Sequence, residues 1–367
     1  EMMRRVISHE IGHALGLPHN MKASSAYPVD SLRSGNFTQK MGIATTIMDY
    51  ARYNYIAQPG DKNIRFVRQL GPYDDYAIEW GYRYFPTETS ETEKVYLKRM
   101  VDEKSTNPIY MFGYNGFDPD SQTENIGDDP IKASNYGLKN LKIVASNLEK
   151  WTTKNGQSYD DLEELYAELI SVYRRYLYHV IRTLGGVHET LLNKGQELLP
   201  YENVNRSQQL EALHFLEQHL WTTQTWLMEP SLISKIKEAG GLELLQNLQR
   251  SALNRILSKD LLNRMLSTQT TLVGTGLSPD QLINSLYTSL FEKITLVDDS
   301  LMALQIHFVN QLTTLIEEDE VNPRIKTTLA AQKRILHKRA QKDSKTSNLL
   351  LKNHYHYISK MTAADRN

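Results

Sequence analysis

The fold of the first part of the chain is decided by one short stretch, His9-Glu10-Ile11-Gly12-His13-Ala14-Leu15-Gly16-Leu17-Pro18-His19. His9 and His13 are four residues apart, so on a helix their imidazoles project from one face and can share one metal ion. Neutral imidazole is a good ligand for zinc. The pattern from Glu1 to Gly16 therefore predicts a helix that carries two zinc ligands.

A third ligand is expected at His19, because a catalytic zinc ion takes three protein ligands and keeps a fourth position open. A straight helix cannot bring His19 back to the ion that His9 and His13 bind. Gly16 accepts the positive φ angles that end helices, and Pro18 disfavours a helix through the residue before it. Both residues lie where the chain has to turn.

Glu10 directly follows the first predicted ligand, so its carboxylate can reach a metal-bound water without binding the metal. Zinc lowers the pKa of such a water to about 7 in metalloproteases, and a carboxylate can then remove its proton. The resulting hydroxide would attack a carbonyl that the zinc polarises. This chemistry predicts Glu10 as the general base of a hydrolase.

The stretch matches the motif H-E-x-x-H-x-x-G-x-x-H of the metzincin clan of zinc metallopeptidases without a gap. The segment Thr46-Ile47-Met48-Asp49-Tyr50 resembles the Met-turn of that clan. By this resemblance, Met48 would form an apolar floor under the histidines without binding the ion. Tyr50 would stabilise the oxyanion, as in the astacin and serralysin branches; the alternative is a packed aromatic side chain. Asn20 stands where many metzincins have Asp, so the hydrogen bonds behind the ligands are expected to differ.

The chain is also similar to a large bacterial group of zinc-dependent metalloproteases, common in Bacteroidetes, whose catalytic domain has been called a met-zincin domain. The similar segments are residues 47–55, 77–82 and 127–137, together with the long helical tail. The resemblance implies a zinc-dependent endopeptidase acting on peptide or protein substrates. It also implies an extracellular, periplasmic or cell-surface location, and further N-terminal domains in the same parent chain.

In metzincins an N-terminal sheet precedes the active-site helix, and its edge strand pairs with the extended substrate. Here almost nothing precedes the helix, so we expect that sheet subdomain to be missing. The expected fold is mainly α: the C-terminal part of a metzincin-like catalytic domain, with active-site helix, Met-turn and a following helix at 71–82, then a large α-helical region. The hypothesis that follows is that this fragment alone has weak or no peptidase activity, while its parent protein is active.

The composition narrows the remaining possibilities. The 367 residues carry a formal net charge of −1, which gives no reason to expect a nucleic-acid partner. No run of apolar residues approaches the roughly 18 residues of a membrane span, so no span is expected in this fragment. Cysteine is absent, which excludes disulfides and thiol metal ligands.

Three regions differ in their residue pattern. Residues 1–85 contain the zinc motif and the Met-turn, and we interpret them as the catalytic part. Residues 86–136 are rich in Gly, Pro, Asn and Asp, which predicts ordered loops packed on the catalytic part. Residues 137–367 show apolar residues at helical spacing and are expected to form an α-helical domain.

Individual helices are predicted in this last region from the spacing of apolar residues, at 162–184, 210–228, 242–266, 301–316 and 325–340. Ser158 is the predicted N-cap of the first, and Gly185-Gly186 its stop. Ser278-Pro279 and Asn322-Pro323 each place a capping residue before a proline, as helix starts prefer.

Other residues of the chain also offer possible metal ligands or pocket residues. Glu79, on the helix after the Met-turn, is an alternative third ligand, but His19 is better spaced. Four carboxylates offer calcium ligands, although turn-forming and capping roles fit their spacing better: Asp118, Asp120, Asp128 and Asp129. Three residues after the Met-turn are candidates to line the substrate pocket: Arg52, Tyr53 and Asn54.

A second function from another class stays open. The chain can be a non-catalytic surface or periplasmic binding protein that keeps a relic zinc site. The intact Glu10 argues against this reading, because a relic site has no need for a general base.

Overall fold

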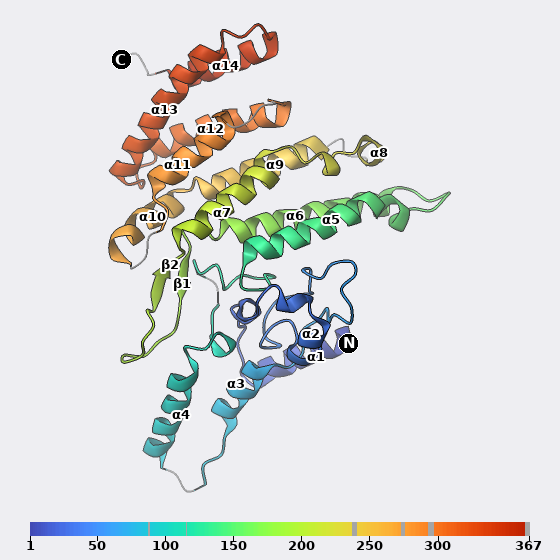
Figure 1. Ribbon diagram of the computed structural model, residues 1–367, viewed down its shortest axis with the longest axis vertical. Helices are drawn as coiled ribbons and strands as arrows, with labels where there is room; N and C mark the ends of the chain where they lie inside the picture. The colour runs from blue at the N-terminus through green and yellow to red at the C-terminus, as the bar shows by residue number, and fades with distance from the viewer. Residues whose placement is uncertain (87–88, 115, 237–240, 273–275, 293–296, 364–367) are drawn as a thin grey trace. The chain divides into compact units, whose positions relative to one another are not determined.

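The computed structural model describes the chain except residues 87–88, 115, 237–240, 273–275, 293–296 and 364–367. The described part is mainly helical, as expected. Its two strands, β1 (Val187–Glu189) and β2 (Tyr201–Asn203), form an antiparallel hairpin in which His188 pairs with Glu202. The chain divides into two compact units (Figure 1). The first comprises Glu1–Leu141 and Gly186–Asn203, and the second comprises Lys142–Gly185 and Val204–Asn367. The expected division at residues 85 and 136 stays a prediction.

The first unit holds the zinc motif and surrounds it with short helices and long ordered loops. Its elements are α1 (Met2–Ala14), η1 (Ala23–Ala26), η2 (Ser31–Arg33), α2 (Gly35–Met41), α3 (Pro72–Tyr82), α4 (Ser90–Lys104), η3 (Pro108–Tyr110) and the hairpin. Its core is built from loop residues rather than from helix faces, because residues 42–49 are all buried. Helix α1 buries only His9 and Gly12, and its apolar Met3, Ile7 and Ile11 remain exposed.

The expectation of loops throughout residues 86–136 is wrong for α4, a helix of 15 residues. Its first turn explains why it forms: the Thr89 hydroxyl accepts a hydrogen bond from the Thr92 amide, and Glu91 and Glu93 complement the helix dipole. Only Met100 of the helix is buried. The apolar periodicity that reveals most helices is therefore weak here.

In the second unit, helices pack against other helices that are close to them in the chain (Figure 1). Its elements are α6 (Asp160–Ile181), α7 (Arg206–Leu216), η4 (Glu217–Trp221), η5 (Thr225–Leu227), α8 (Pro230–Ile233), α9 (Gly241–Ile256), α10 (Lys259–Thr271), α11 (Pro279–Tyr287), η6 (Thr288–Glu292), α12 (Asp299–Glu317), α13 (Pro323–Asp343) and α14 (Leu349–Thr362). Contacts join α6 to α7 and α9, α9 to α12, α12 to α13, and α13 to α14. Helix α5 (Pro130–Thr152) begins in the first unit and continues into the second.

The predicted starts at Ser278 and Asn322 are confirmed, since both side chains cap the helices that follow, each with proline at the first position. The helices at 301–316 and 325–340 are also confirmed. The N-cap of α6 is Tyr159 rather than Ser158, whose hydroxyl instead donates to the Asp160 carboxylate.

Two predicted helices are wrong in extent. The helix expected at 210–228 is an α-helix only as far as Leu216 and continues as the π turn η4 to Trp221. The carbonyl of Leu220 in that turn accepts a hydrogen bond from the side-chain amide of Gln249 in α9. The helix expected at 242–266 is two helices. Ser258 begins the second, accepting a hydrogen bond from the Leu261 amide, so the chain breaks while the apolar spacing continues.

A search of the described helices for a stretch long and apolar enough to cross a membrane finds none.

Candidate metal centre

Helix α1 and the turn after it place three histidines together. His9 and His13 lie on one face of α1, with their ring centroids 4.8 Å apart. The helix then ends in a Schellman motif: Leu17 N donates to Gly12 O at 3.0 Å, and Gly16 N donates to His13 O at 2.9 Å. Gly16 has φ +81°, as the sequence predicts, so the chain reverses and returns His19 to the helix face.

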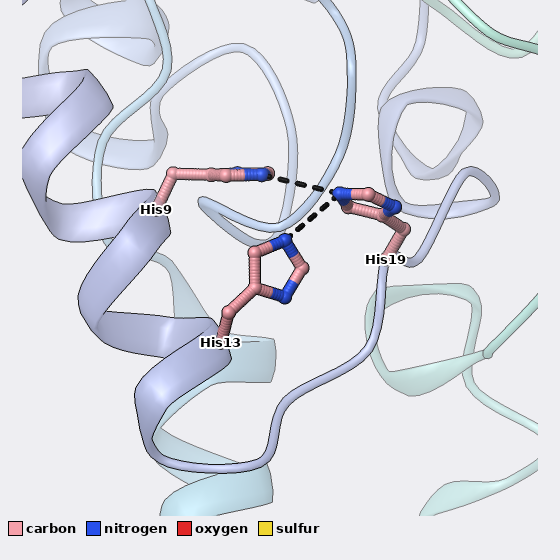
Figure 2. Close-up of side chains that lie close together, drawn as sticks. All are labelled: His9, His13 and His19. Atoms are coloured by element: carbon pink, nitrogen blue, oxygen red, sulfur yellow. Dashed lines mark hydrogen bonds between the residues drawn. The ribbon is translucent and has the colours of Figure 1, made fainter.

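The three imidazoles converge on one centre (Figure 2). The Nε2 atom of His19 lies 3.2 Å from Nε2 of His9 and 2.9 Å from Nε2 of His13. Tetrahedral zinc with nitrogen ligands at about 2.0–2.1 Å places those nitrogens about 3.3 Å apart, close to both distances. His9 is buried, whereas His13 is exposed. The centre is therefore open to solvent on one side.

The hydrogen bonds behind two of the rings decide which nitrogens face the centre. His9 Nδ1 lies 2.8 Å from the carbonyl of Ile47, and His13 Nδ1 lies 2.9 Å from the carbonyl of Leu17. A carbonyl only accepts, so each Nδ1 carries a proton, and each neutral ring turns an Nε2 lone pair inward. His19 can donate a proton to only one of them. The donor set thus fits a shared cation, and three neutral imidazoles suit zinc.

For His9 and His19, burial and nearby positive charge favour the neutral ring that metal binding requires. Burial lowers the pKa of His9. The hydrogen bond to Ile47 opposes this by raising the pKa, and the charge of the nearby Arg68 lowers it further. Burial also lowers the pKa of His19, with further lowering by His13 and His9.

Met48 lies in the core under α1, as the Met-turn resemblance predicts for a floor. Its side chain is 1% exposed, and a Cβ atom at Gly12 would overlap its sulfur. Glycine at position 12 is therefore what lets α1 approach the methionine.

The Met-turn is held from below by Asp74 in the first turn of α3. The Asp74 carboxylate accepts hydrogen bonds from the Thr46 hydroxyl, from Ile47 N at 2.9 Å and from Gly71 N at 2.8 Å. The Thr46 hydroxyl in turn accepts from Met48 N at 3.0 Å. This arrangement fixes the Ile47 carbonyl that orients His9, and the sequence alone did not reveal it.

A second buried carboxylate, Asp49, accepts from Ser24 N at 2.8 Å and Ala51 N at 2.6 Å. Burial raises the pKa of Asp49 to about 7, against the lowering effect of the Ala51 hydrogen bond and of Arg68. Arg68 donates to the Ile47 carbonyl at 2.9 Å, the same oxygen that His9 binds. The arginine therefore acts on the metal centre through one shared acceptor.

Two tyrosines lie against the centre. The Tyr50 ring centroid is 4.4 Å from that of His19 and 5.7 Å from that of His9, and the side chain is 37% exposed. Its predicted role at the oxyanion stays a prediction. The Tyr114 ring stacks on His19 at 6.2 Å with planes 10° apart. No spacing pattern in the sequence indicates Tyr114, which is 95 residues beyond that histidine (114 − 19).

Glu10 is exposed on α1 beside the first histidine. Its charge raises the pKa of both His9 and His19, although burial outweighs it in each case, so the carboxylate lies within electrostatic reach of the centre. Among the described residues, nothing hydrogen-bonds or ion-pairs with it. The carboxylate oxygens are therefore available to a molecule bound at the centre.

A second group with metal-ligand chemistry combines Asp118 and Asp120 with His188 of β1. Here the cation is already present: Lys22 Nζ lies 2.6 Å from the Asp118 carboxylate and donates to the Glu189 carbonyl at 2.6 Å. His188 Nδ1 lies 2.8 Å from Asp120. Lys22 pairs with Asp118 and His188 pairs with Asp120, so this group is a partly buried network of ion pairs and hydrogen bonds.

The remaining candidates have structural partners. Asp128 accepts from Val29 N, and Asp129 caps α5, which are the turn and capping roles expected. Glu79 is exposed and paired with Arg83, outside the histidine group. Asn54 is 2% exposed and donates to the Leu32 carbonyl. Pocket-lining roles for Arg52 and Tyr53 stay predictions.

Comparison with known proteins agrees with this geometry. A family model described as Met-zincin matches residues 1–296, most of the chain. No curated protein and no solved structure matches the chain. The family implies zinc binding and a metallopeptidase type of active site, consistent with the three converging imidazoles. The chain therefore belongs to the Met-zincin family.

Proposed function

We propose that the protein is a zinc-dependent metalloendopeptidase, with His9, His13 and His19 as zinc ligands and Glu10 as general base. One observation carries the proposal: three imidazole nitrogens face a single centre, and an unbonded carboxylate acts electrostatically on two of those imidazoles, His9 and His19. A purely structural zinc site has no use for such a carboxylate. Membership of the Met-zincin family supports the same class of reaction.

When zinc is bound, it supplies a Lewis acid that polarises the scissile carbonyl and makes water more acidic. Glu10 takes a proton from the attacking water, and the same carboxyl then gives this proton to the leaving amine nitrogen. The Tyr50 hydroxyl donates a hydrogen bond to the carbonyl oxygen as it gains negative charge. The Ile47 and Leu17 carbonyls keep His9 and His13 oriented throughout, so little reorganisation is needed.

The substrates proposed are peptide or protein chains, and the proposed location is outside the cytoplasm. Both follow from the resemblance to exported bacterial metalloproteases rather than from the geometry of the site. Cell fractionation with detection of the protein in the periplasm, cell surface or medium tests the location. Its recovery in the cytoplasm alone would refute it.

The test of the reaction combines a peptide-library cleavage assay, a zinc chelator and the variant Glu10→Gln. We expect cleavage by the wild type in its full-length parent chain, loss of cleavage with the chelator, and recovery when zinc is returned. The variant keeps the size of the side chain but cannot accept the proton, so kcat should fall by about 10²–10⁴-fold. Elemental analysis should find the same zinc content in the variant as in the wild type.

Glu79→Gln is the matched control, because Glu79 is an exposed carboxylate of the same unit that lies outside the histidine group. It should leave kcat unchanged. Cleavage that survives both the chelator and Glu10→Gln would refute the mechanism. A wild type that binds zinc but cleaves no peptide would favour the non-catalytic binding protein.

A further inference from the structure

The segment from Met111 to Tyr114 is pinned alongside the third histidine. Asn20, which follows His19, is fully buried and binds this segment in both directions. Its Nδ2 donates to the Met111 carbonyl at 2.9 Å, and its Oδ1 accepts from Gly113 N at 3.0 Å. Met21 N also donates to the Gly113 carbonyl at 2.7 Å. Three hydrogen bonds thus tie a segment distant in sequence to the residues just after a ligand.

The same segment is backed by a rigid layer. A Cβ atom at Gly113 would overlap the Ser121 hydroxyl and lie 3.0 Å from Cβ of Lys22, so the backbone is in close contact with what lies behind it. Lys22 and its partner Asp118 are both buried, with 6% and 1% of their side chains exposed. Breaking a buried ion pair is costly, because one charge is left uncompensated. The segment is therefore held in place before any substrate arrives.

Tyr114 is the side chain that this support presents to the metal centre. Its ring stacks on His19, yet 55% of the side chain remains exposed. Tyr50 contacts the same histidine and is also partly exposed. Two aromatic rings with free surface thus flank one ligand. A large aromatic side chain held rigidly and left open to solvent is suited to bind another apolar or aromatic group.

We propose that Tyr114 is a specificity-determining residue, which contacts a substrate side chain next to the scissile bond and selects aromatic or large apolar residues there. This inference rests on the proposed peptidase function. Stacked aromatic pairs contribute enough to change recognition about three- to tenfold. The alternative is a purely structural role, in which the Tyr114 ring only orients the imidazole of His19.

The experiment compares Tyr114→Ala, Tyr114→Phe and the wild type on paired peptides that differ only by Phe or Ala beside the scissile bond. Tyr114→Ala should lower the preference for the Phe peptide, as the ratio of kcat/KM values, about three- to tenfold, chiefly through KM. Tyr114→Phe retains the ring and should keep the wild-type preference. Tyr84→Ala is the control, since Tyr84 is 84% exposed in the same unit.

A binding measurement separates the inference from the reaction. In the Glu10→Gln background, fluorescence anisotropy should give a wild-type preference for the Phe peptide that Tyr114→Ala removes, with zinc content unchanged. An unaltered preference in Tyr114→Ala, in an enzyme that cleaves peptides, would overturn the inference alone. Lost zinc, or an equal loss of kcat on both peptides, would assign Tyr114 the structural role. A wild type that neither cleaves nor binds peptides would overturn the proposed function as well.

Discussion

Gly12 is the residue on which the approach of α1 to the Met-turn depends. It lies between the two ligand histidines of α1, and its missing side chain leaves room for the sulfur of Met48. Any side chain at position 12 would have to displace the methionine or lift the helix. Since His9 and His13 are carried by that helix, either response moves the ligands.

The variant Gly12→Ala should therefore destabilise the first unit, even though alanine is the better helix former. Overpacking a filled core costs about 1–3 kcal/mol, which exceeds the gain in helix propensity. Urea denaturation and zinc titration measure the two effects, and we expect a lower midpoint together with weaker zinc binding. Gly81→Ala in α3 is the control, because a Cβ there meets nothing within 4 Å. Equal behaviour of the two variants would disprove the packing argument.

At this scale the sequence predicts what is local. The spacing of His9 and His13, and the turn at Gly16, follow from helix geometry and glycine conformation alone. Arg68, Asp74 and Tyr114 act on the same centre, but they are distant in the chain and carry no motif. Their roles depend on which loops pack together, and a spacing rule contains no information about that.

Among the elements, the link between the Met-turn and α3 carries the most consequence. A single carboxylate, Asp74, serves as the acceptor for the turn and for the start of the helix. The Met-turn has no regular structure of its own, so its shape depends on acceptors supplied by other elements.

Asp74→Ala should leave the Thr46 hydroxyl and two buried amides without their acceptor. Each orphaned buried donor costs about 1–3 kcal/mol, so the first unit should lose about 3 kcal/mol or more. Because the Ile47 carbonyl would shift, zinc affinity should fall as well. Asp75→Ala, in the same helical turn but exposed, should change neither the denaturation midpoint nor the zinc affinity. Retention of both properties in Asp74→Ala would contradict this account.

Helix prediction succeeds where a cap coincides with the apolar spacing and fails where the two disagree. At Ser278 and Asn322 the cap and the spacing agree, and both starts are confirmed. Ser258 caps a new helix, but the helical spacing of apolar residues continues across it. The spacing therefore predicts one helix where the structure has two. Helix α4 has a capping residue but little helical spacing of apolar residues, because it buries only Met100. The spacing therefore does not predict this helix.

Across the whole molecule, the two units differ in what stabilises them. The first depends on buried polar contacts around the metal centre, whereas the second is packed from apolar helix faces. A buried histidine, His354 of α14, is an exception in the second unit. It is 7% exposed, and its Nε2 lies 2.7 Å from Gln305 Oε1, so that nitrogen carries the proton. Burial lowers the pKa of His354 to about 4.

This residue predicts acid sensitivity of the second unit. The unfolded chain binds a proton at His354 near pH 6.5 and the folded chain only near pH 4, so stability is lost as pH falls through that range. The loss should be about 2 kcal/mol after allowance for solvent screening. His354→Gln can still donate to Gln305 but does not titrate. Its urea midpoint should fall less between pH 7 and pH 4 than that of the wild type.

His356→Gln is the matched control, because His356 lies on the same helix but is exposed. It should keep the pH dependence of the wild type. If the urea midpoint of His354→Gln changed with pH as much as that of the wild type, the buried imidazole would not be the cause of the acid sensitivity.

The three histidines all come from the eleven residues His9–His19, and this contiguity sets an order of events during synthesis. The whole donor set precedes the Met-turn and α3 in the chain, so it emerges first from a ribosome or an export channel. Closing so short a loop costs little entropy, and an ion shared by His9 and His13 stabilises a helical turn that is otherwise slow to nucleate. Zinc capture can therefore come first, with the methionine floor and Asp74 folding onto an ion already in place. Zinc supply in the compartment where the chain folds would then govern the yield of folded protein.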